Sequence, residues 1–166
     1  MTKTKTNTID GVIIKGMRLY KDERGYLSEG FRHDEIDKSL YPAMSYISIT
    51  HPGIARGPHE HIEQTDFFCF PGPSTFELCL WDNRKNSPTY RENITVKVGE
   101  NNPTIAIIPP GVVHAYKNIG DSEGLVINFP NRLFAGWNKK EKVDEIRHEN
   151  DADSLFKIEE AACKLY

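Results

Sequence analysis

Two histidine-bearing segments place the tightest constraint on how this chain can fold. Residues 56–61 read Arg-Gly-Pro-His-Glu-His, and residues 109–118 read Pro-Pro-Gly-Val-Val-His-Ala-Tyr-Lys-Asn, so each joins a strand-like run to a turn of Gly and Pro. His59 and His61 are two residues apart and would face the same side of a strand. His114 is distant in sequence and can meet them only if the sheet curls on itself. The pattern predicts a small β-barrel with imidazoles converging in its mouth, suited to proton transfer or to holding a metal.

Most of the remaining chain consists of short strand-like runs at close, regular spacing. The runs lie at residues 11–15, 26–31, 43–50, 66–70, 75–81, 93–98, 104–108, 112–116 and 124–129. Residues 22–25 form a turn between the first two runs, and the Pro-Gly-Pro-Ser turn at residues 71–74 predicts a hairpin between the runs that flank it. This rhythm is typical of an antiparallel sandwich or barrel.

Helical signals are few. Residues 34–40 fit a turn or two, and the charged residues 139–149 fit an exposed helix or a lid-like loop. Residues 153–166 begin with a capping residue and carry apolar residues at helical spacing, which predicts a short C-terminal helix. With 166 residues and no repeat or linker, we expect a single domain over residues 1–166. Its core would span about residues 11–130, and residues 131–166 would fold back on the barrel.

Charge and cysteine content narrow the class of protein. Lys and Arg number 21 against 24 Asp and Glu, a net charge of −3, which gives no indication of nucleic-acid or anionic-membrane binding. The three cysteines form no close pairing motif, which fits a reducing compartment better than a disulfide framework. No apolar run approaches the length of a membrane span, and the N-terminus lacks the apolar stretch of a signal peptide. A soluble cytoplasmic protein is therefore expected.

The second histidine segment matches a known motif at every defining position. The second cupin motif is Pro-x-Gly-x-x-His-x-x-x-Asn, and the matching residues are Pro109, Gly111, His114 and Asn118. Residues 57–66 resemble the first cupin motif, a glycine followed by His-x-His and an acid, with a shortened spacing after the glycine and Asp66 at the acidic position.

A narrower resemblance rests on an ordered set of motifs. The set comprises residues 22–25 with Glu29, residues 56–59, residues 82–89, residues 109–114 and residues 150–153. In this order, and from about residue 11 to about residue 158, the chain resembles the dTDP-4-dehydrorhamnose 3,5-epimerase family of sugar-nucleotide cupins. Arg84 is expected to form an internal ion pair with Asp82 rather than to clamp a diphosphate.

The resemblance implies a fold, a reaction and catalytic residues. The fold is all-β, an antiparallel double-stranded β-helix (the cupin or jelly-roll barrel). The reaction is epimerisation of a nucleotide-linked 4-keto-6-deoxy sugar. His59 matches the base that removes the proton alpha to the keto group, and Asp151 matches the aspartate that orients this base. Arg56 matches an arginine near the diphosphate or the keto oxygen.

The predicted substrate contacts surround these residues. Arg24 and Glu29 match family residues that contact the nucleotide, and His114 matches a histidine in the barrel mouth. The full set of predicted substrate-binding residues is Arg24, Glu29, Tyr46, His61, His114 and Tyr116.

Two catalytic positions of the family are replaced in this chain. The family carries a lysine on the strand after the first motif, where it helps to stabilise the enolate, and the alignment puts Phe67 there. The family's acid is a tyrosine after the last core strand, and residues 131–134 contain none. Tyr46, on the same strand face as Ser48 and Thr50, and Tyr116, which shares a face with His114, are the alternative proton donors.

Three functions stay open at this point. The favoured one is an epimerase or isomerase without a redox cofactor, in a homodimer that pairs an exposed edge strand across a two-fold axis. A metal-dependent cupin of another reaction class is the second; no metal is favoured, but its ligands would be His59, His61, Asp66 and His114. A non-catalytic cupin that binds a sugar nucleotide is the third, because the family's lysine and tyrosine are missing.

Overall fold

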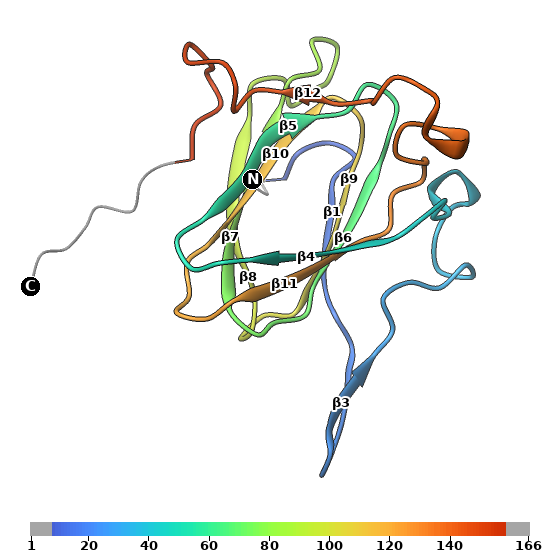
Figure 1. Cartoon of the computed structure of the whole chain (residues 1–166), viewed down its shortest axis with the longest axis vertical. Coiled ribbons are helices and arrows are strands. Elements are labelled where there is room, and N and C mark those ends of the chain that lie inside the picture. The colour runs from blue at the N-terminus through green and yellow to red at the C-terminus, as the bar shows by residue number, and fades with distance from the viewer. Residues whose placement is uncertain (1–7, 159–166) are drawn as a thin grey trace, which may run out of the picture.

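The computed structural model describes residues 8–158, which form two five-stranded antiparallel sheets closed into a barrel, with one separate hairpin (Figure 1). The sheets have the strand orders β1-β9-β6-β11-β4 and β12-β5-β10-β7-β8. The elements are β1 (Ile13–Gly16), β2 (Leu19–Asp22), β3 (Gly25–Ser28), the 3-10 turn η1 (Lys38–Leu40), β4 (Tyr46–Thr50), β5 (Ala55–Glu60), β6 (Asp66–Phe70), β7 (Thr75–Asp82), β8 (Asn93–Gly99), β9 (Thr104–Ile108), β10 (Val112–Asn118), β11 (Gly124–Asn128), the 3-10 turn η2 (Trp137–Lys139) and β12 (Ile146–Arg147). The predicted all-β cupin barrel is confirmed.

The hairpin predicted at residues 71–74 is wrong. β6 pairs with β9 and β11, whereas β7 pairs with β8 and β10, so the turn at residues 71–74 crosses from one sheet to the other. Turn residues indicate that the chain reverses but not which strand supplies the hydrogen bonds. The turn at residues 22–25 does close a hairpin, between β3 and the unpredicted strand β2, while β1 pairs with β9.

Alternation along β6 divides its side chains between two clusters. Phe68 and Phe70 pack between the sheets, with ring centroids 5.8 and 5.6 Å from that of Tyr116. Phe67 and Cys69 belong to the second cluster, which the segment before β4 covers. Successive side chains of a strand face opposite sides, so this strand is buried on both faces. Burying each phenylalanine contributes roughly 1.5–3 kcal/mol to this core.

The segments predicted to be helical form loops and turns wherever the structure describes them. Residues 34–40 form only the turn η1, and the cover at residues 139–149 is a loop that contains β12. Residues 153–158 carry no helix, and residues 159–166 lie outside the described part of the chain. Phe156 gives the physical reason, because its ring packs on Trp81 and His148 at centroid distances of 6.0 and 4.7 Å. Such contacts outweigh the weak intrinsic preference of a short helical segment. None of the helical elements in residues 8–158 has the length and hydropathy of a membrane span.

The carboxylate of Asp82 organises the loop between β7 and β8. It is 1% exposed and accepts hydrogen bonds from Arg84 Nε at 2.8 Å and from Thr89 Oγ1 at 2.6 Å, with a further bond from Ser87. Burial raises the pKa of Asp82, but these bonds outweigh burial and hold the pKa well below its usual range. The internal ion pair predicted for Arg84 is confirmed.

Candidate active site

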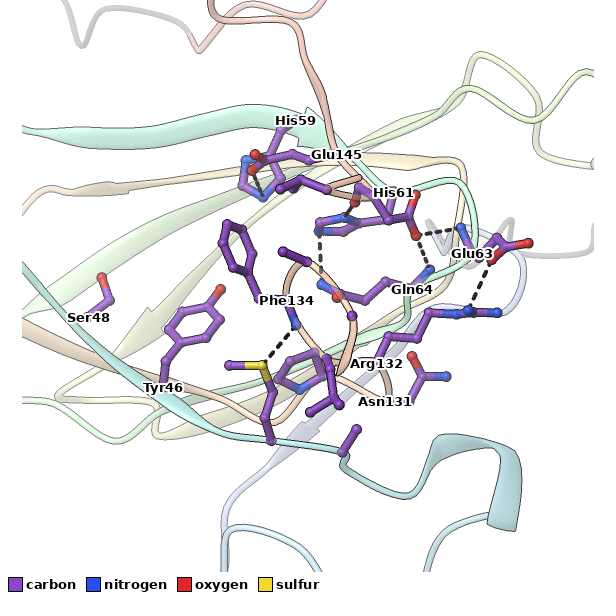
Figure 2. Close-up of a pocket in the computed structure, with 18 of the residues that line it drawn as sticks. Tyr46, Ser48, His59, His61, Glu63, Gln64, Asn131, Arg132, Phe134 and Glu145 are labelled. Carbon is purple, nitrogen blue, oxygen red and sulfur yellow. Dashed lines mark hydrogen bonds and ion pairs between the residues drawn. The ribbon is translucent and has the colours of Figure 1, made fainter. Parts of the chain in front are cut away.

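Polar side chains replace the apolar core at one end of the barrel, where a cavity of about 1460 Å³ opens. Its walls come from β4 in one sheet and β5 in the other, and the segment 130–149, here called the rim loop, borders it. Figure 2 shows His59 and His61 along one side of the cavity, and Tyr46 and Ser48 on the other. Pockets for small ligands commonly measure roughly 300–1,000 Å³. This cavity therefore has room for a ligand larger than a monosaccharide.

The three histidines predicted to converge do so. β5 and β10 are antiparallel neighbours, and His59 lies opposite His114 in their register. The ring centroid of His114 lies 4.4 Å from that of His59 and 5.8 Å from that of His61. Gly57 permits this close approach, because its φ is +80° and a Cβ there would lie 2.5 Å from the carbonyl oxygen of His114.

Asp66, at the start of β6, brings a carboxylate to the same point. Its Oδ2 lies 3.1 Å from His61 Nε2 and 3.0 Å from His114 Nε2. Its Oδ1 accepts hydrogen bonds from Asn128 Nδ2 at 2.8 Å and Gln64 Nε2 at 2.9 Å. Burial raises the pKa of Asp66, but the two imidazoles outweigh burial and lower it well below the usual range. The structure thus groups the four candidate metal ligands, with one ligand atom from each lying within 4.8 Å of the others.

His59 and His61 lie in opposite electrostatic environments. Burial, followed by the neighbouring imidazoles of His114 and His61, lowers the pKa of His59 to about 3. Burial also lowers the pKa of His61, but the adjacent carboxylate of Asp66, 3.1 Å from His61 Nε2, outweighs burial and raises that pKa to about 9. His59 is therefore neutral near pH 7 and has a lone pair with which to accept a proton.

The carboxylate beside His59 belongs to Glu145, not to the predicted Asp151. Glu145 Oε1 lies 3.9 Å from His59 Nε2, with side chains 15% and 14% exposed. Asp151 is exposed and its carboxylate accepts the backbone N–H of Asp153 at 3.0 Å, so the predicted contact with His59 is wrong. β12 brings Glu145 to this position by pairing with β5, with Arg147 opposite His59. The sequence showed only a charged run there, which carries no signal for this pairing.

A second carboxylate of the rim loop fastens it to the histidine turn. Asp144 accepts the backbone N–H groups of Ile62, Glu63 and Gln64 at 2.8, 2.9 and 2.8 Å. Its own carbonyl oxygen contacts His61 Nδ1. Burial raises the pKa of Asp144, but the three N–H groups outweigh burial and lower it. The rim loop is thus anchored beside the converging histidines.

Both candidate tyrosines reach the cavity, at different depths. The hydroxyl oxygen of Tyr46, whose residue is 41% exposed, accepts a hydrogen bond from Asn128 Nδ2 at 2.9 Å. Tyr116 is 3% exposed, and its hydroxyl lies 3.2 Å from Ser48 Oγ. Burial is the main reason that the pKa of each phenol is raised. Both phenols therefore keep their protons at neutral pH.

Of the three charged residues predicted to contact the diphosphate or the nucleotide, only Arg56 lines the cavity. Arg56 lines the cavity, and its guanidinium donates to Thr50 Oγ1 at 3.1 Å. Arg24 and Glu29 do not line the cavity of their own chain. The β2–β3 hairpin that carries Arg24 extends away from the barrel (Figure 1), and its side chain is 84% exposed. Glu29 pairs instead with Arg32 at 2.9 Å.

The structure also locates the positions where the family's lysine and tyrosine were expected. Phe67 packs in the cluster outside the barrel, so it cannot take the lysine's place in the cavity. The inward neighbours on β6 are Asp66 and Phe68, and the carboxylate of Asp66 is the polar one. Residues 131–134 line the cavity without supplying a phenol.

Known proteins are similar to this chain in sequence and in fold. The family model for dTDP-4-dehydrorhamnose 3,5-epimerase matches residues 6–141. The probable low-salt glycan biosynthesis epimerase Agl13 of Haloferax volcanii is 38% identical over 127 residues, which cover 76% of this chain and 81% of that protein. The spore coat polysaccharide biosynthesis protein SpsL of Bacillus subtilis is 34% identical over 121 residues, 73% of this chain and 79% of that protein. A dTDP sugar isomerase from Desulfovibrio desulfuricans has the same fold, with a TM-score of 0.76 at 24% identity over 87% of each chain. By its sequence, its barrel and its converging histidines, the chain belongs to the dTDP-4-dehydrorhamnose 3,5-epimerase family.

Proposed function

We propose that this protein epimerises a nucleotide-linked 4-keto-6-deoxy sugar at a carbon alpha to the keto group. The observation that carries the proposal is the placement of His59, a partly buried neutral imidazole on the wall of a cavity large enough for a sugar nucleotide. Membership of a family of sugar-nucleotide epimerases supports it.

The reaction transfers one proton off the sugar and one proton back. His59 accepts the proton of the alpha carbon, and the electron pair of the broken C–H bond moves into the keto group to give an enolate. Protonation of the same carbon from the opposite face inverts the centre and restores the ketone. His59 then releases its proton to solvent, and the donor takes one up from solvent. Glu145 lies close enough to His59 to stabilise the imidazolium that forms. A general base in this role contributes roughly 10²–10⁴-fold to the rate.

Inversion requires a proton donor on the face opposite the base. Tyr46 stands on β4, in the sheet that faces β5 and His59 across the cavity. Its oxygen accepts the bond from Asn128, so its own O–H is free to donate into the cavity. Tyr116 lies among the core aromatics and shares its hydroxyl with Ser48. We therefore assign Tyr46 as the donor, ahead of Tyr116.

The nucleotide would occupy the outer part of the cavity. Basic and aromatic side chains line this part, namely Arg56, Arg132, Lys139, Lys142 and Trp137. Guanidinium and ammonium groups bind diphosphate oxygens, and an exposed indole gives a base a surface to stack on. Because Arg24 and Glu29 lie outside this cavity, their predicted nucleotide contact would come from a second copy of the chain. A homodimer that covers the exposed apolar side chains of the β2–β3 hairpin, Tyr20, Tyr26 and Leu27, would supply it.

Deuterium exchange from solvent into a dTDP-4-keto-6-deoxy-hexose tests the reaction. NMR of the recovered sugar reports uptake at C3 and C5 separately. We expect uptake at one or both carbons with the wild-type protein, and a loss of roughly 10²–10⁴-fold with His59→Gln. Tyr46→Phe should slow inversion more than Tyr116→Phe.

The matched control is His51→Gln, because His51 is an exposed histidine that also pairs with a carboxylate, Glu123, at 2.9 Å. This variant should exchange like the wild type. Wild-type protein that binds the nucleotide without any exchange at either carbon would refute the proposed reaction, and full exchange by His59→Gln would refute the assignment of the base.

A further inference from the structure

We propose that His61, His114 and Asp66 form a binding site for one divalent transition-metal ion. His61 follows β5, and His114 lies on β10, the neighbour of β5 in the same sheet, whereas Asp66 begins β6 in the other sheet. The closed barrel brings these side chains together beside the cavity that His61 lines. The binding claim rests on the geometry of these side chains and not on the reaction proposed above.

The hydrogen bond of His114 fixes which ring nitrogen carries the proton. Its Nδ1 lies 3.1 Å from the carbonyl oxygen of Val112. A carbonyl oxygen can only accept, so Nδ1 is the protonated nitrogen of the neutral ring and Nε2 holds the lone pair. His114 is 1% exposed, and within the described chain Nε2 has no hydrogen-bond partner. A buried lone pair without a partner is costly unless a cation occupies it.

His61 is oriented in the same way. Its Nδ1 contacts the carbonyl oxygen of Asp144, so its Nε2 also presents a lone pair when the ring is neutral. The amide nitrogen of Gln64 lies 3.2 Å from this Nε2. A metal ion would displace that neutral donor from the ring and leave the amide's 2.9 Å bond to Asp66 Oδ1 in place.

Asp66 completes a set of three electron-rich atoms. Its Oδ2 lies 3.0 and 3.1 Å from the two Nε2 atoms, yet it is buried without a hydrogen-bond partner among residues 8–158. The two Nε2 atoms therefore lie close to this oxygen, but their N–H directions are not aligned for hydrogen bonds to it. Two ligand atoms at right angles around an ion, with bonds of about 2.1 Å, lie about 3.0 Å apart. The observed spacings match that edge length.

The surroundings of the three residues resemble the outer shell of a metal centre. Backbone carbonyls hold both imidazoles through Nδ1, and Asn128 and Gln64 hold the second oxygen of Asp66. Partners of this kind orient metal ligands and fix the histidine tautomer. Two imidazoles and one carboxylate suit Mn, Fe, Co, Ni or Zn better than Mg or Ca.

The proposed ion would leave His59 free. His59 lies beside the site, with its ring centroid 4.4 Å from that of His114, and its Nε2 faces Glu145. Provided that the proposed epimerisation takes place here, the ion would polarise the keto oxygen and stabilise the enolate, the task of the lysine that this chain lacks. His61 lines the cavity, so the proposed site borders the space that a substrate would occupy.

Cobalt titration of the full-length protein, without an affinity tag and after dialysis against a chelator, tests the site. The readouts are visible absorption of the bound ion, metal content by mass spectrometry and the melting temperature. We expect about one Co²⁺ per chain and a higher melting temperature for the wild type. Asp66→Asn and His61→Gln should each weaken binding by at least about tenfold, since even the loss of an outer-shell partner costs roughly 10–100-fold. His51→Gln should bind like the wild type.

Two results would overturn the proposal: folded wild-type protein that binds no Co²⁺ in stoichiometric amount, or binding that survives unchanged in both ligand variants. His61→Gln keeps the test decisive if Asp66→Asn fails to fold, because His61 lies at the cavity wall. The deuterium assay separates this claim from the proposed function. Stoichiometric binding of Co²⁺ without deuterium exchange would support the metal site and refute the epimerase. Deuterium exchange by protein that binds no Co²⁺ would support the epimerase and refute the metal site.

Discussion

Replacing Asp144 by alanine should detach the rim loop from the turn that carries His61. The carboxylate of Asp144 accepts three backbone N–H groups at 2.8–2.9 Å, and no other side chain of the described residues bonds to these groups. A hydrogen bond contributes roughly 0.5–1.5 kcal/mol net. Water can replace part of this here, because Ile62 is 66% exposed. Taking the lower half of the range for three bonds gives a loss of about 2 kcal/mol.

That loss should appear as a melting temperature lower by about 4–8 °C, since 1 kcal/mol corresponds to roughly 2–4 °C in a domain of this size. The amides of Ile62, Glu63 and Gln64 should exchange hydrogen faster in the variant. Asp144→Asn keeps at most two of the three hydrogen bonds, so its melting temperature should lie between those of Asp144→Ala and the wild type. Asp121→Ala removes an exposed aspartate elsewhere and serves as the matched control.

The effect should depend on pH in a defined direction. The folded protein lowers the pKa of Asp144, so the carboxylate contributes its stability above the unfolded carboxyl pKa of about 4 and loses it as the pH falls through the folded value. The stability difference between wild type and Asp144→Ala should therefore be constant near neutral pH and shrink below about pH 4. Unchanged amide exchange in the variant, with a melting temperature equal to that of Asp121→Ala, would refute the anchoring role.

Three further substitutions test other parts of the structure. Glu145→Gln should lower kcat for deuterium exchange by about tenfold, less than loss of His59 itself, because the carboxylate acts on the base from 3.9 Å. Gly57→Ala should cost about 1–3 kcal/mol in chemical denaturation, because its φ is +80° and the new Cβ would meet the carbonyl of His114. Asp82→Asn should cost about 1–3 kcal/mol in the same assay by weakening the buried network of the β7–β8 loop, and a loss below about 0.5 kcal/mol would contradict that role.

The three converging histidines could be predicted from the sequence because each of the two segments that carry them has a recognisable local pattern. His59 and His61 share a strand face through the two-residue period, and Gly57 and Gly111 mark the tight backbone at each segment. The same alternation correctly placed Tyr46 and Ser48 on one face of β4, where Tyr46 contacts Asn128 and Ser48 contacts Tyr116. The converging side chains follow from two short motifs, at residues 56–61 and 109–118, whereas the barrel and the family followed from the order of strands and motifs along the chain.

Strand pairing was harder to predict from the sequence, and the turn at residues 71–74 shows why. The residues of a turn specify a reversal, whereas the partner of each flanking strand depends on which sheet buries its side chains. Phe67 is a similar case, because an alignment of the sequence could not tell the inward from the outward face of β6. A shift of one residue exchanges the two faces, so only the packing showed that Asp66 points to His61 and His114 inside the barrel.

The sequence by itself determined which strand side chains converge, and only the tertiary structure decided which side chains surround them. Glu145 reaches His59 from 86 positions along the chain, and Asp144 holds the histidine turn, through a loop without a periodic pattern. The predicted Asp151 lies a few residues farther on and faces solvent. Strand periodicity is set by neighbouring residues, but the path of such a loop is set by the contacts that it finds on the finished barrel.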